Sequence, residues 1–240
     1  EFVSKPDFDS KTETEKFIKD LIFKIKIAAT AKPNAHRRAA AGVVENKAPN
    51  TEKIIAIGAS TGGTEAIYSI LKSFPKNAPG VVIVQHIPPE FSKLFSERLD
   101  RQTNLCVKEA ETGDFIESGK VLLAPGDRHM RIQKLGNRYR VECFRGNKVN
   151  GHCPSVDVLF ESVAKAAGKQ AVGVILTGMG NDGARGLYGM RRMGALTIGQ
   201  NEKSSVVYGM PRTAYNIGAV AKQVSLEAIP ATIMAALRQS

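Results

Sequence analysis

The chain has 240 residues, of which 42% are hydrophobic, so it can bury a full core in one large or two small domains. No apolar run approaches the roughly 20 residues that a membrane helix needs, and residues 1–5 lack the features of a secretion signal. Three cysteines without paired spacing, Cys106, Cys143 and Cys153, argue against a disulfide framework. These features predict a soluble globular protein that resides in the cytoplasm and does not insert into a membrane.

The net charge is strongly positive, because 34 Lys and Arg face 23 Asp and Glu and give +11 at pH 7. Residues 1–52 carry only +2 of this charge, which leaves +9 for the rest of the chain. Such an excess favours an acidic partner, which can be nucleic acid, anionic lipid or an acidic protein surface. We expect no nucleic-acid partner, because the chain has no tryptophan, 6% aromatic residues and no recognisable nucleic-acid motif.

The first 52 residues differ in composition from the rest of the chain. Residues 10–13 read Ser-Lys-Thr-Glu, a capping box that predicts a helix whose apolar face is formed by Phe17, Ile18, Leu21, Ile22 and Ile25. Residues 30–51 contain almost no large apolar side chains, which is typical of a poorly ordered linker. We place the domain boundary near residue 52. Since no methionine opens the chain, we also expect it to be a piece of a longer protein.

Beyond residue 52, short apolar runs alternate with helical patterns. Strands are predicted at 54–57, 81–85, 120–124, 171–177 and 195–198, and helices at about 63–74, 88–101, 155–168, 182–193 and 226–238. Continuous apolar strands that alternate with helices indicate an α/β fold with a parallel sheet covered on both faces. Residues 129–144 instead alternate polar and apolar side chains around Gly136-Asn137, which predicts an antiparallel hairpin attached to that sheet.

A glycine-flanked serine follows the first of these strands. Residues 58–62, Gly-Ala-Ser-Thr-Gly, match the pattern G-x-S-x-G, with an apolar strand before it and a helical pattern after it. The small neighbours permit a sharp turn that exposes the Ser60 hydroxyl at the carboxyl end of the sheet. Backbone N–H groups in such a turn favour negative charge, so it fits either a bound phosphate or the oxyanion of an acyl transfer.

The nucleotide-binding alternative lacks its other signals. The chain contains no G-x-x-x-x-G-K-[ST] motif, and its glycine spacing is not G-x-G-x-x-G. In a dinucleotide site the next strand ends in Asp or Glu, whereas the strand at 81–84 is followed by Gln85 and His86. A regulatory module that binds phosphate at the Ser60 turn without chemistry is the second hypothesis that the residues leave open.

His86 and Asp182 are the expected partners of Ser60. Strand ends of an open α/β sheet meet at one crevice, so His86 is placed to act as the base for Ser60. Asp182 lies in a glycine-rich turn after the strand at 171–177 and is the best-placed carboxylate to orient that histidine. Simpler interpretations also exist, since Ser60 and Asp182 suit helix N-caps and His86 suits a packed histidine bonded to a backbone carbonyl.

The remaining histidines give no metal signal. His129 and His152 have no second ligand at metal spacing, so a metal site is not expected. His152 and Cys153 are adjacent, and adjacent residues seldom face each other productively, so we interpret Cys153 as structural.

Six stretches of the main domain follow one another in a characteristic order: IGASTGGTEAI, VVIVQHIPPEFSKLFSERLD, VLLAPGDRHM, HCPSVDVLFESVA, VILTGMGNDGARGL and GQNEKSSVVYGMPRTAYNIGAV. Together they resemble the CheB family of chemotaxis receptor methylesterases, which are protein-glutamate methylesterases and protein-glutamine glutaminases. The resemblance covers nearly all of residues 53–240. It implies a doubly wound, mainly parallel sheet with helices on both faces and an antiparallel β-hairpin near one edge.

The resemblance also implies the site. Ser60, His86 and Asp182 would form the catalytic triad, and the backbone amides of Thr61 and Met179 would form the oxyanion hole, with neither a metal nor an organic cofactor. The implied substrates are γ-glutamyl methyl esters, and certain glutamines, on the cytoplasmic helices of methyl-accepting chemotaxis receptors. A basic rim around the cleft would attract such acidic helices.

Members of this family carry an N-terminal receiver domain that blocks the active site until it is phosphorylated. By resemblance, residues 1–30 are the C-terminal remnant of a receiver, with its last strand and last helix and with Lys5 at the phosphorylation-sensing lysine. Residues 31–52 are then a basic flexible linker, and residues 53–240 are the methylesterase catalytic domain. A chemotaxis histidine kinase is the implied partner, through the missing part of the receiver domain.

Overall fold

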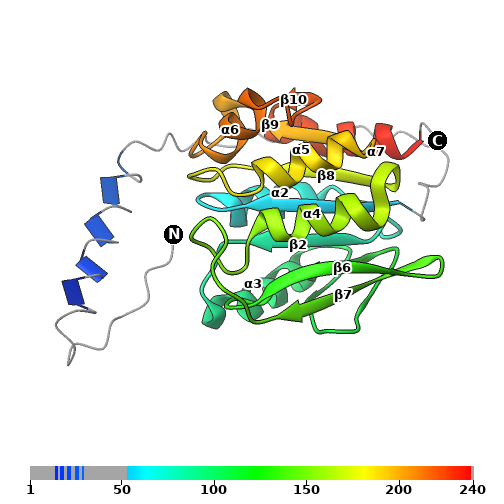
Figure 1. Ribbon diagram of the computed structural model, residues 1–240, viewed down its shortest axis with the longest axis horizontal. Helices are drawn as coiled ribbons and strands as arrows, with labels where there is room; N and C mark the ends of the chain where they lie inside the picture. Colours follow the sequence, from blue (N-terminus) through cyan, green and yellow to red (C-terminus); the bar gives the residue numbers. More distant parts are fainter. Residues whose placement is uncertain are drawn as a thin grey trace.

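The structure, a computed structural model, describes residues 53–238 and the N-terminal residues 14, 15, 17, 18, 21, 22, 25, 26 and 29 (Figure 1). Those N-terminal residues are helical, as the apolar pattern predicts. The capping box at 10–13, the expected last receiver strand with Lys5 and the linker at 31–52 lie outside the described residues. No helix in the described part is long and apolar enough to cross a membrane.

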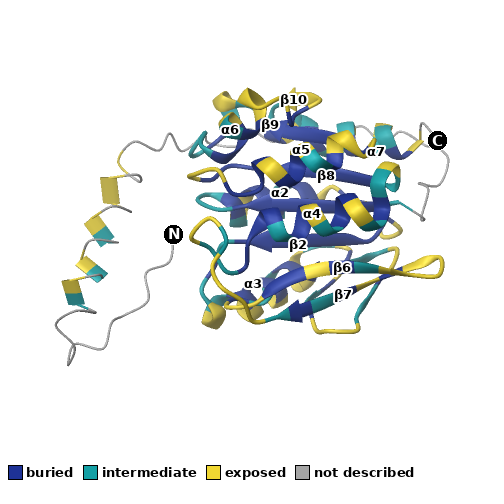
Figure 2. Cartoon of the chain, viewed as in Figure 1, coloured by how far each residue is buried: buried dark blue, intermediate teal, exposed yellow. Residues whose placement is uncertain are grey.

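A seven-stranded sheet in which every neighbouring pair is parallel forms the centre of the main domain. Its strands, in spatial order, are β10 (Lys222–Val224), β9 (Leu196–Gln200), β8 (Ala171–Ile175), β1 (Ile54–Ala59), β2 (Val81–Gln85), β5 (Lys120–Leu123) and β3 (Cys106–Glu109). The central strands β1, β2 and β8 are buried along their whole length (Figure 2), which explains why they read as unbroken apolar runs.

Helices cover both faces of this sheet (Figure 1). Residues Ile55 and Ile57 of β1 share one core cluster with α2 (Gly63–Lys72), α3 (Pro89–Gln102) and α7 (Ile229–Arg238). Residues Ile54 and Ala56 share the other cluster with α4 (Val156–Ala167), α5 (Ala184–Arg192) and α6 (Met210–Asn216). Alternate side chains of one strand therefore belong to opposite layers, as expected for a doubly wound fold.

The predicted hairpin is present and carries a third strand. Strands β6 (His129–Leu135) and β7 (Arg138–Phe144) pair antiparallel, and β4 (Phe115–Ile116) pairs with the other edge of β7. This three-stranded sheet is separate from the parallel one and packs against α4, where the Ser162 hydroxyl accepts a hydrogen bond from the Ile132 amide at 2.9 Å.

The elements that the sequence analysis did not predict are short and lie mostly at edges. They are β3, β4, β10, α6 and the 3-10 turns at Gly168–Gln170, Glu202–Ser204 and Leu226–Ala228. The edge strand β10 is mostly exposed, and β3 has one buried residue, so neither carries the continuous apolar run of the central strands.

The order of the strands determines where a site can form. On one side of β1 the chain passes to β2, then to the edge strand β3 and back to β5, which lies between β2 and β3. On the other side of β1 it passes through β8, β9 and β10. The winding therefore reverses between β1 and β8, and ligands of open α/β sheets bind beyond the carboxyl ends of the strands at such a point. Ser60 follows β1, His86 follows β2, and the loop that contains Asp182 follows β8.

Candidate active site

Ser60 lies in the tight turn between β1 and α2. The Ser60 carbonyl accepts a hydrogen bond from the Gly63 amide at 2.7 Å, and the Ser60 amide donates to the Thr177 carbonyl at 3.0 Å. Gly62 has φ = 78° and forms the N-cap of α2, a conformation that favours glycine. The backbone of the turn is therefore fixed, while the Ser60 hydroxyl makes no hydrogen bond with the described residues.

Thr177 holds the peptide that follows Ser60. Its hydroxyl donates to the Thr61 carbonyl at 2.9 Å and accepts from the Val207 amide at 2.9 Å, and it is only 1% exposed. Its own amide donates to Gln200 Oε1 at 2.8 Å. With its carbonyl bound in this way, the Thr61 peptide is oriented, and the Thr61 amide has no acceptor among the described residues.

The second expected oxyanion donor lies in the loop after β8. Gly178 packs so closely against Ser60 that an added Cβ would come within 2.7 Å of the Ser60 Cβ. The Gly178 carbonyl accepts from the amides of Gly209 and Met210 at 3.1 and 2.8 Å, which anchors the loop. Met179 follows, 37% exposed, and within the described chain its amide also lacks an acceptor. Thr61 and Met179 thus both keep an uncommitted backbone N–H next to the serine turn.

His86 and Asp182 are in direct contact. His86 Nε2 lies 2.8 Å from Asp182 Oδ2, and their side chains are 7% and 1% exposed. The other ring nitrogen of His86, Nδ1, is buried and has no hydrogen-bond partner in the described structure. If Nε2 carries the proton that binds the carboxylate, Nδ1 is a free base. No hydrogen bond joins it to the Ser60 hydroxyl, a contact that often tightens only when substrate binds.

Asp182 accepts hydrogen bonds on both of its carboxylate oxygens. Besides His86, Oδ2 accepts from the Val156 amide at 2.6 Å. Oδ1 accepts from Asn150 Nδ2 at 2.9 Å, the Ser155 hydroxyl at 2.7 Å and the Asp157 amide at 3.2 Å. A carboxylate that accepts several such bonds is stabilised in its ionised form even when buried.

The pKa values of the two neighbouring aspartates, Asp182 and Asp157, are shifted in opposite directions. Burial tends to raise the pKa of Asp182, but the hydrogen bonds from His86, Asn150 and Ser155 outweigh it and hold the pKa well below its usual range. Burial also raises the pKa of Asp157, and there the bonds from the Gly186 amide and Asn150 do not compensate, in part because Asp182 is close. The lowered pKa keeps the Asp182 carboxylate ionised, which suits it to stabilise a protonated His86.

Gln85 connects the serine and histidine turns. It is 3% exposed, and its Nε2 donates to the Ser60 carbonyl at 2.9 Å and to the His86 carbonyl at 3.1 Å. The His86 amide in turn donates to the Ala59 carbonyl at 3.1 Å. One buried amide thus fixes the backbone of the proposed nucleophile relative to that of the proposed base.

The simpler interpretations of these residues do not hold. Helix α2 is capped by Gly62 and α5 by Gly183, so neither Ser60 nor Asp182 is an N-cap. His86 contacts a carboxylate rather than a backbone carbonyl.

Burial raises the pKa of the Cys153 thiol, which favours the neutral thiol over the nucleophilic thiolate.

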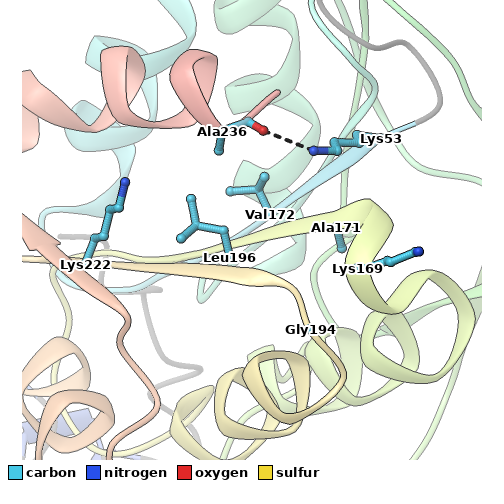
Figure 3. A pocket seen from close by; sticks show the side chains of 8 residues that line it. All are labelled: Lys53, Lys169, Ala171, Val172, Gly194, Leu196, Lys222 and Ala236. Atoms are coloured by element: carbon cyan, nitrogen blue, oxygen red, sulfur yellow. Dashed lines mark hydrogen bonds between the residues drawn. The ribbon is translucent and has the colours of Figure 1, made fainter. Parts of the chain in front are cut away.

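The described residues contain no group of three or more His, Cys, Asp or Glu arranged to hold a metal ion. A small hollow lies at the opposite, amino end of the sheet and is lined by Lys53, Lys169 and Lys222 among mainly apolar residues (Figure 3). There Lys53 Nζ donates to the Ala236 carbonyl at 3.0 Å.

The sequence analysis named five candidate site residues but not the residues that hold them in place. Gln85 entered the sequence analysis only as evidence against a dinucleotide site, where an Asp or Glu is expected. The other supporting residues, Asn150, Ser155, Thr177 and Gln200, were not identified. Asn150 and Ser155 reach Asp182 across 32 and 27 residues of chain, a distance at which no local pattern reports a contact.

Comparisons with known proteins all point to one family. Residues 55–233 match the family model described as CheB methylesterase. The protein-glutamate methylesterase/protein-glutamine glutaminase 2 of Syntrophomonas wolfei is 51% identical over 230 residues, which cover 95% of this chain and 67% of that relative. The Salmonella typhimurium enzyme named protein-glutamate methylesterase/protein-glutamine glutaminase is 47% identical over 98% of this chain and 68% of its own. The crystal structure of the Thermotoga maritima CheB methylesterase catalytic domain superposes with a TM-score of 0.74 at 34% identity and covers 76% of this chain and 97% of that one.

Proposed function

The chain belongs to the CheB methylesterase family, and from this premise we propose that Ser60, His86 and Asp182 are the catalytic triad of its protein-glutamate methylesterase and protein-glutamine glutaminase activity. The observation that carries the proposal is the His86 ring, whose Nε2 contacts a buried, ionised Asp182 while its buried Nδ1 has no partner among the described residues. An unsatisfied buried nitrogen is costly unless a ligand or a reacting group completes it.

The first half of the reaction makes an ester of Ser60. His86 Nδ1 accepts the proton of the Ser60 hydroxyl as Oγ attacks the γ-carbonyl of the methylated glutamate. The resulting imidazolium keeps its Nε2–H on Asp182. The Thr61 and Met179 amides donate to the oxyanion, and as it collapses the C–O bond to methoxide breaks and His86 protonates the leaving group to methanol.

The second half returns the enzyme to its starting state. His86 Nδ1 removes a proton from a water molecule that attacks the glutamyl-Ser60 ester, and the same proton then passes to Ser60 as the C–O bond breaks. The product is a free glutamate side chain. A glutamine substrate follows the same steps, with ammonia in place of methanol as the first leaving group.

The macromolecular partners follow from the family. We infer that the modified glutamates belong to methyl-accepting chemotaxis receptors and that the enzyme works in the cytoplasm. We also infer that residues 1–30 complete a receiver domain that accepts a phosphoryl group from a chemotaxis histidine kinase, and that residues 31–52 link it to the catalytic domain at 53–240. Purifying the chain with its natural upstream sequence and measuring phosphoryl transfer from such a kinase tests the receiver assignment.

The triad is tested by methanol release from receptor-bearing membranes that carry labelled methyl esters. We expect Ser60→Ala to abolish release, whereas Ser73→Ala, at the opposite end of the same helix, should retain the wild-type rate. Ammonia release from unmodified receptor glutamines should be lost in parallel. Wild-type release by a folded Ser60→Ala variant would contradict the proposal.

A further inference from the structure

A tight turn between β7 and α4 places two side chains on the triad. The turn is closed by two hydrogen bonds between the backbones of Val149 and His152, both at 3.0 Å, and Asn150 adopts φ = 52° within it. Asn150 donates to Asp182, as described above. The His152 ring lies on the His86 ring with the centroids 3.7 Å apart and the planes inclined by 11°. One turn therefore contacts both the carboxylate of Asp182 and the ring of His86, the proposed base.

His152, which is partly buried, differs from the buried His129 of the same region. His129 uses both ring nitrogens, since Nε2 contacts the Asn147 carbonyl at 2.9 Å and Nδ1 accepts from the Ser155 amide at 3.2 Å. The ring nitrogens of His152 make no hydrogen bond within the described part of the chain. The contact that its side chain does make is the stack on His86. Packing against the base, rather than hydrogen bonding, is thus what this ring contributes.

A stacked ring restrains a motion that Asp182 leaves free. The hydrogen bond at Nε2 fixes one side of the His86 ring, but rotation about the Cβ–Cγ bond is soft for histidine and changes the direction in which Nδ1 points. A flat ring parallel to His86 at van der Waals distance opposes this rotation, because any tilt brings the two rings into collision.

We propose that His152 is a positioning residue for the hydrolysis, which holds the His86 ring in the plane that presents Nδ1 to Ser60. The inference rests on the triad assignment above, and it extends that assignment to a residue outside the triad.

The charge state of His152 suits this role. The charged or titratable groups that face the two rings are Asp182 and Lys148, with Asp157 beyond Asn150. Burial and the proximity of His86 lower the pKa of His152 to about 4. At neutral pH His152 is therefore an uncharged aromatic ring, and the imidazolium that forms on His86 during the reaction does not meet a second cation.

The test compares His152→Ala, which removes the ring, with His152→Phe, which keeps a flat ring that cannot titrate or bond. Methanol release is measured against receptor concentration to separate kcat from KM. We expect His152→Ala to lower kcat on the order of 10-fold with little change in KM, and His152→Phe to restore most of the loss. Arg145→Ala, which truncates an exposed side chain in the same connection between β7 and α4, is the matched control and should retain the wild-type kcat.

Nitrogen NMR of the His86 ring gives a readout that lost stability alone does not change. The wild type should show one tautomer with the proton on Nε2, and His152→Ala should show exchange between ring states. If His152→Ala unfolds, His152→Gln replaces it, because it fills a similar volume without a flat ring. The lower kcat and the exchange between ring states of His86 are expected for this variant too. A wild-type kcat in the folded Ala variant, or a Phe variant as slow as Ala, would overturn the inference. Methanol release by Ser60→Ala would instead overturn the triad.

Discussion

The polar residues at the two ends of the parallel sheet differ in burial: those at the carboxyl end are buried, and those at the amino end are exposed. At the carboxyl end, Gln85, Thr177, Asp182 and Gln200 are at most 3% exposed, and each of them is hydrogen-bonded to another part of the site. At the amino end, Lys169 and Lys222 are exposed to solvent around the small hollow (Figure 3). Burying polar groups is costly unless each finds a partner.

The difference shows what the buried network is for. The strand cores are equally apolar at both ends, so packing alone does not require polar residues at either end. The buried polar groups at the carboxyl end orient the backbone around Ser60 and the side chain of Asp182. The comparison leads to four predictions, ordered from the largest expected effect to the smallest.

The largest effect is expected at the base. His86→Ala removes the group that moves the proton in both halves of the reaction, and methanol release should fall on the order of 10⁴-fold. Asp182→Asn should cost a similar factor, because its new NH₂ group faces hydrogen-bond donors and destabilises the required tautomer of His86. Circular dichroism and thermal unfolding check that each variant is folded. A loss of less than 10-fold in either variant would contradict the triad.

A smaller loss of activity is expected when Gln85, which links the Ser60 and His86 turns, is replaced. Gln85→Leu keeps a buried side chain but removes the donor shared by the Ser60 and His86 carbonyls. The Ser60 carbonyl keeps its hydrogen bond from the Gly63 amide, whereas the His86 carbonyl loses its donor, which costs roughly 1–3 kcal/mol of stability. The resulting misalignment should lower kcat about 10- to 100-fold. Gln133→Leu removes a hydrogen-bonded glutamine from the antiparallel sheet and serves as the control. Equal kcat values for the two variants would show that Gln85 has no special role.

The two aspartates should affect the pH dependence of stability in opposite ways. The pKa of Asp182 is lowered in the folded protein, so its contribution is present above the unfolded pKa of about 4 and is lost as the pH falls further. The pKa of Asp157 is raised, so its contribution grows as the pH falls through that raised pKa.

Urea unfolding between pH 3 and 7 measures both contributions. Asp182→Asn should flatten the fall in the free energy of unfolding on the acid side, and Asp157→Asn should steepen it. If both substitutions changed the acid-side slope in the same direction, the assignment of the ionised carboxylate to Asp182 would be wrong.

The smallest effect is expected at the amino end of the sheet. Lys169→Ala and Lys222→Ala alter exposed side chains far along the sheet from Ser60. Each should change the free energy of unfolding by less than about 0.5 kcal/mol and leave kcat unchanged. A 10-fold loss of methanol release in either variant would mean that this end of the sheet also serves the reaction.

The fold could be predicted where burial dictates the sequence. Strands β1, β2 and β8 are buried throughout and read as continuous apolar runs, and the alternation across β6 and β7 predicted the hairpin. Strand β10 escaped prediction because only its last residue is even partly buried. The separate antiparallel sheet was also not foreseen, since the two-residue strand β4 carries too little pattern to indicate that it would pair with β7.

The juxtaposition of the three proposed triad residues could be predicted because parallel topology determines their meeting point. Ser60, His86 and Asp182 each follow a strand, and three neighbouring parallel strands bring their carboxyl ends together. The supporting contacts depend instead on the three-dimensional path of loops. His152 reaches His86 from a turn whose shape depends on Asn150 at positive φ, and single-sequence patterns do not report such a turn.

The most direct test of the account is a covalent bond on Ser60. The enzyme is mixed with methyl-esterified receptor, quenched with acid within a turnover, digested, and analysed by mass spectrometry. We predict that the peptide containing Ser60 carries the glutamyl group of the receptor through an ester on Oγ, and that His86→Ala accumulates none. Methanol release without acylation of Ser60, or acylation of a different residue, would contradict the central claim.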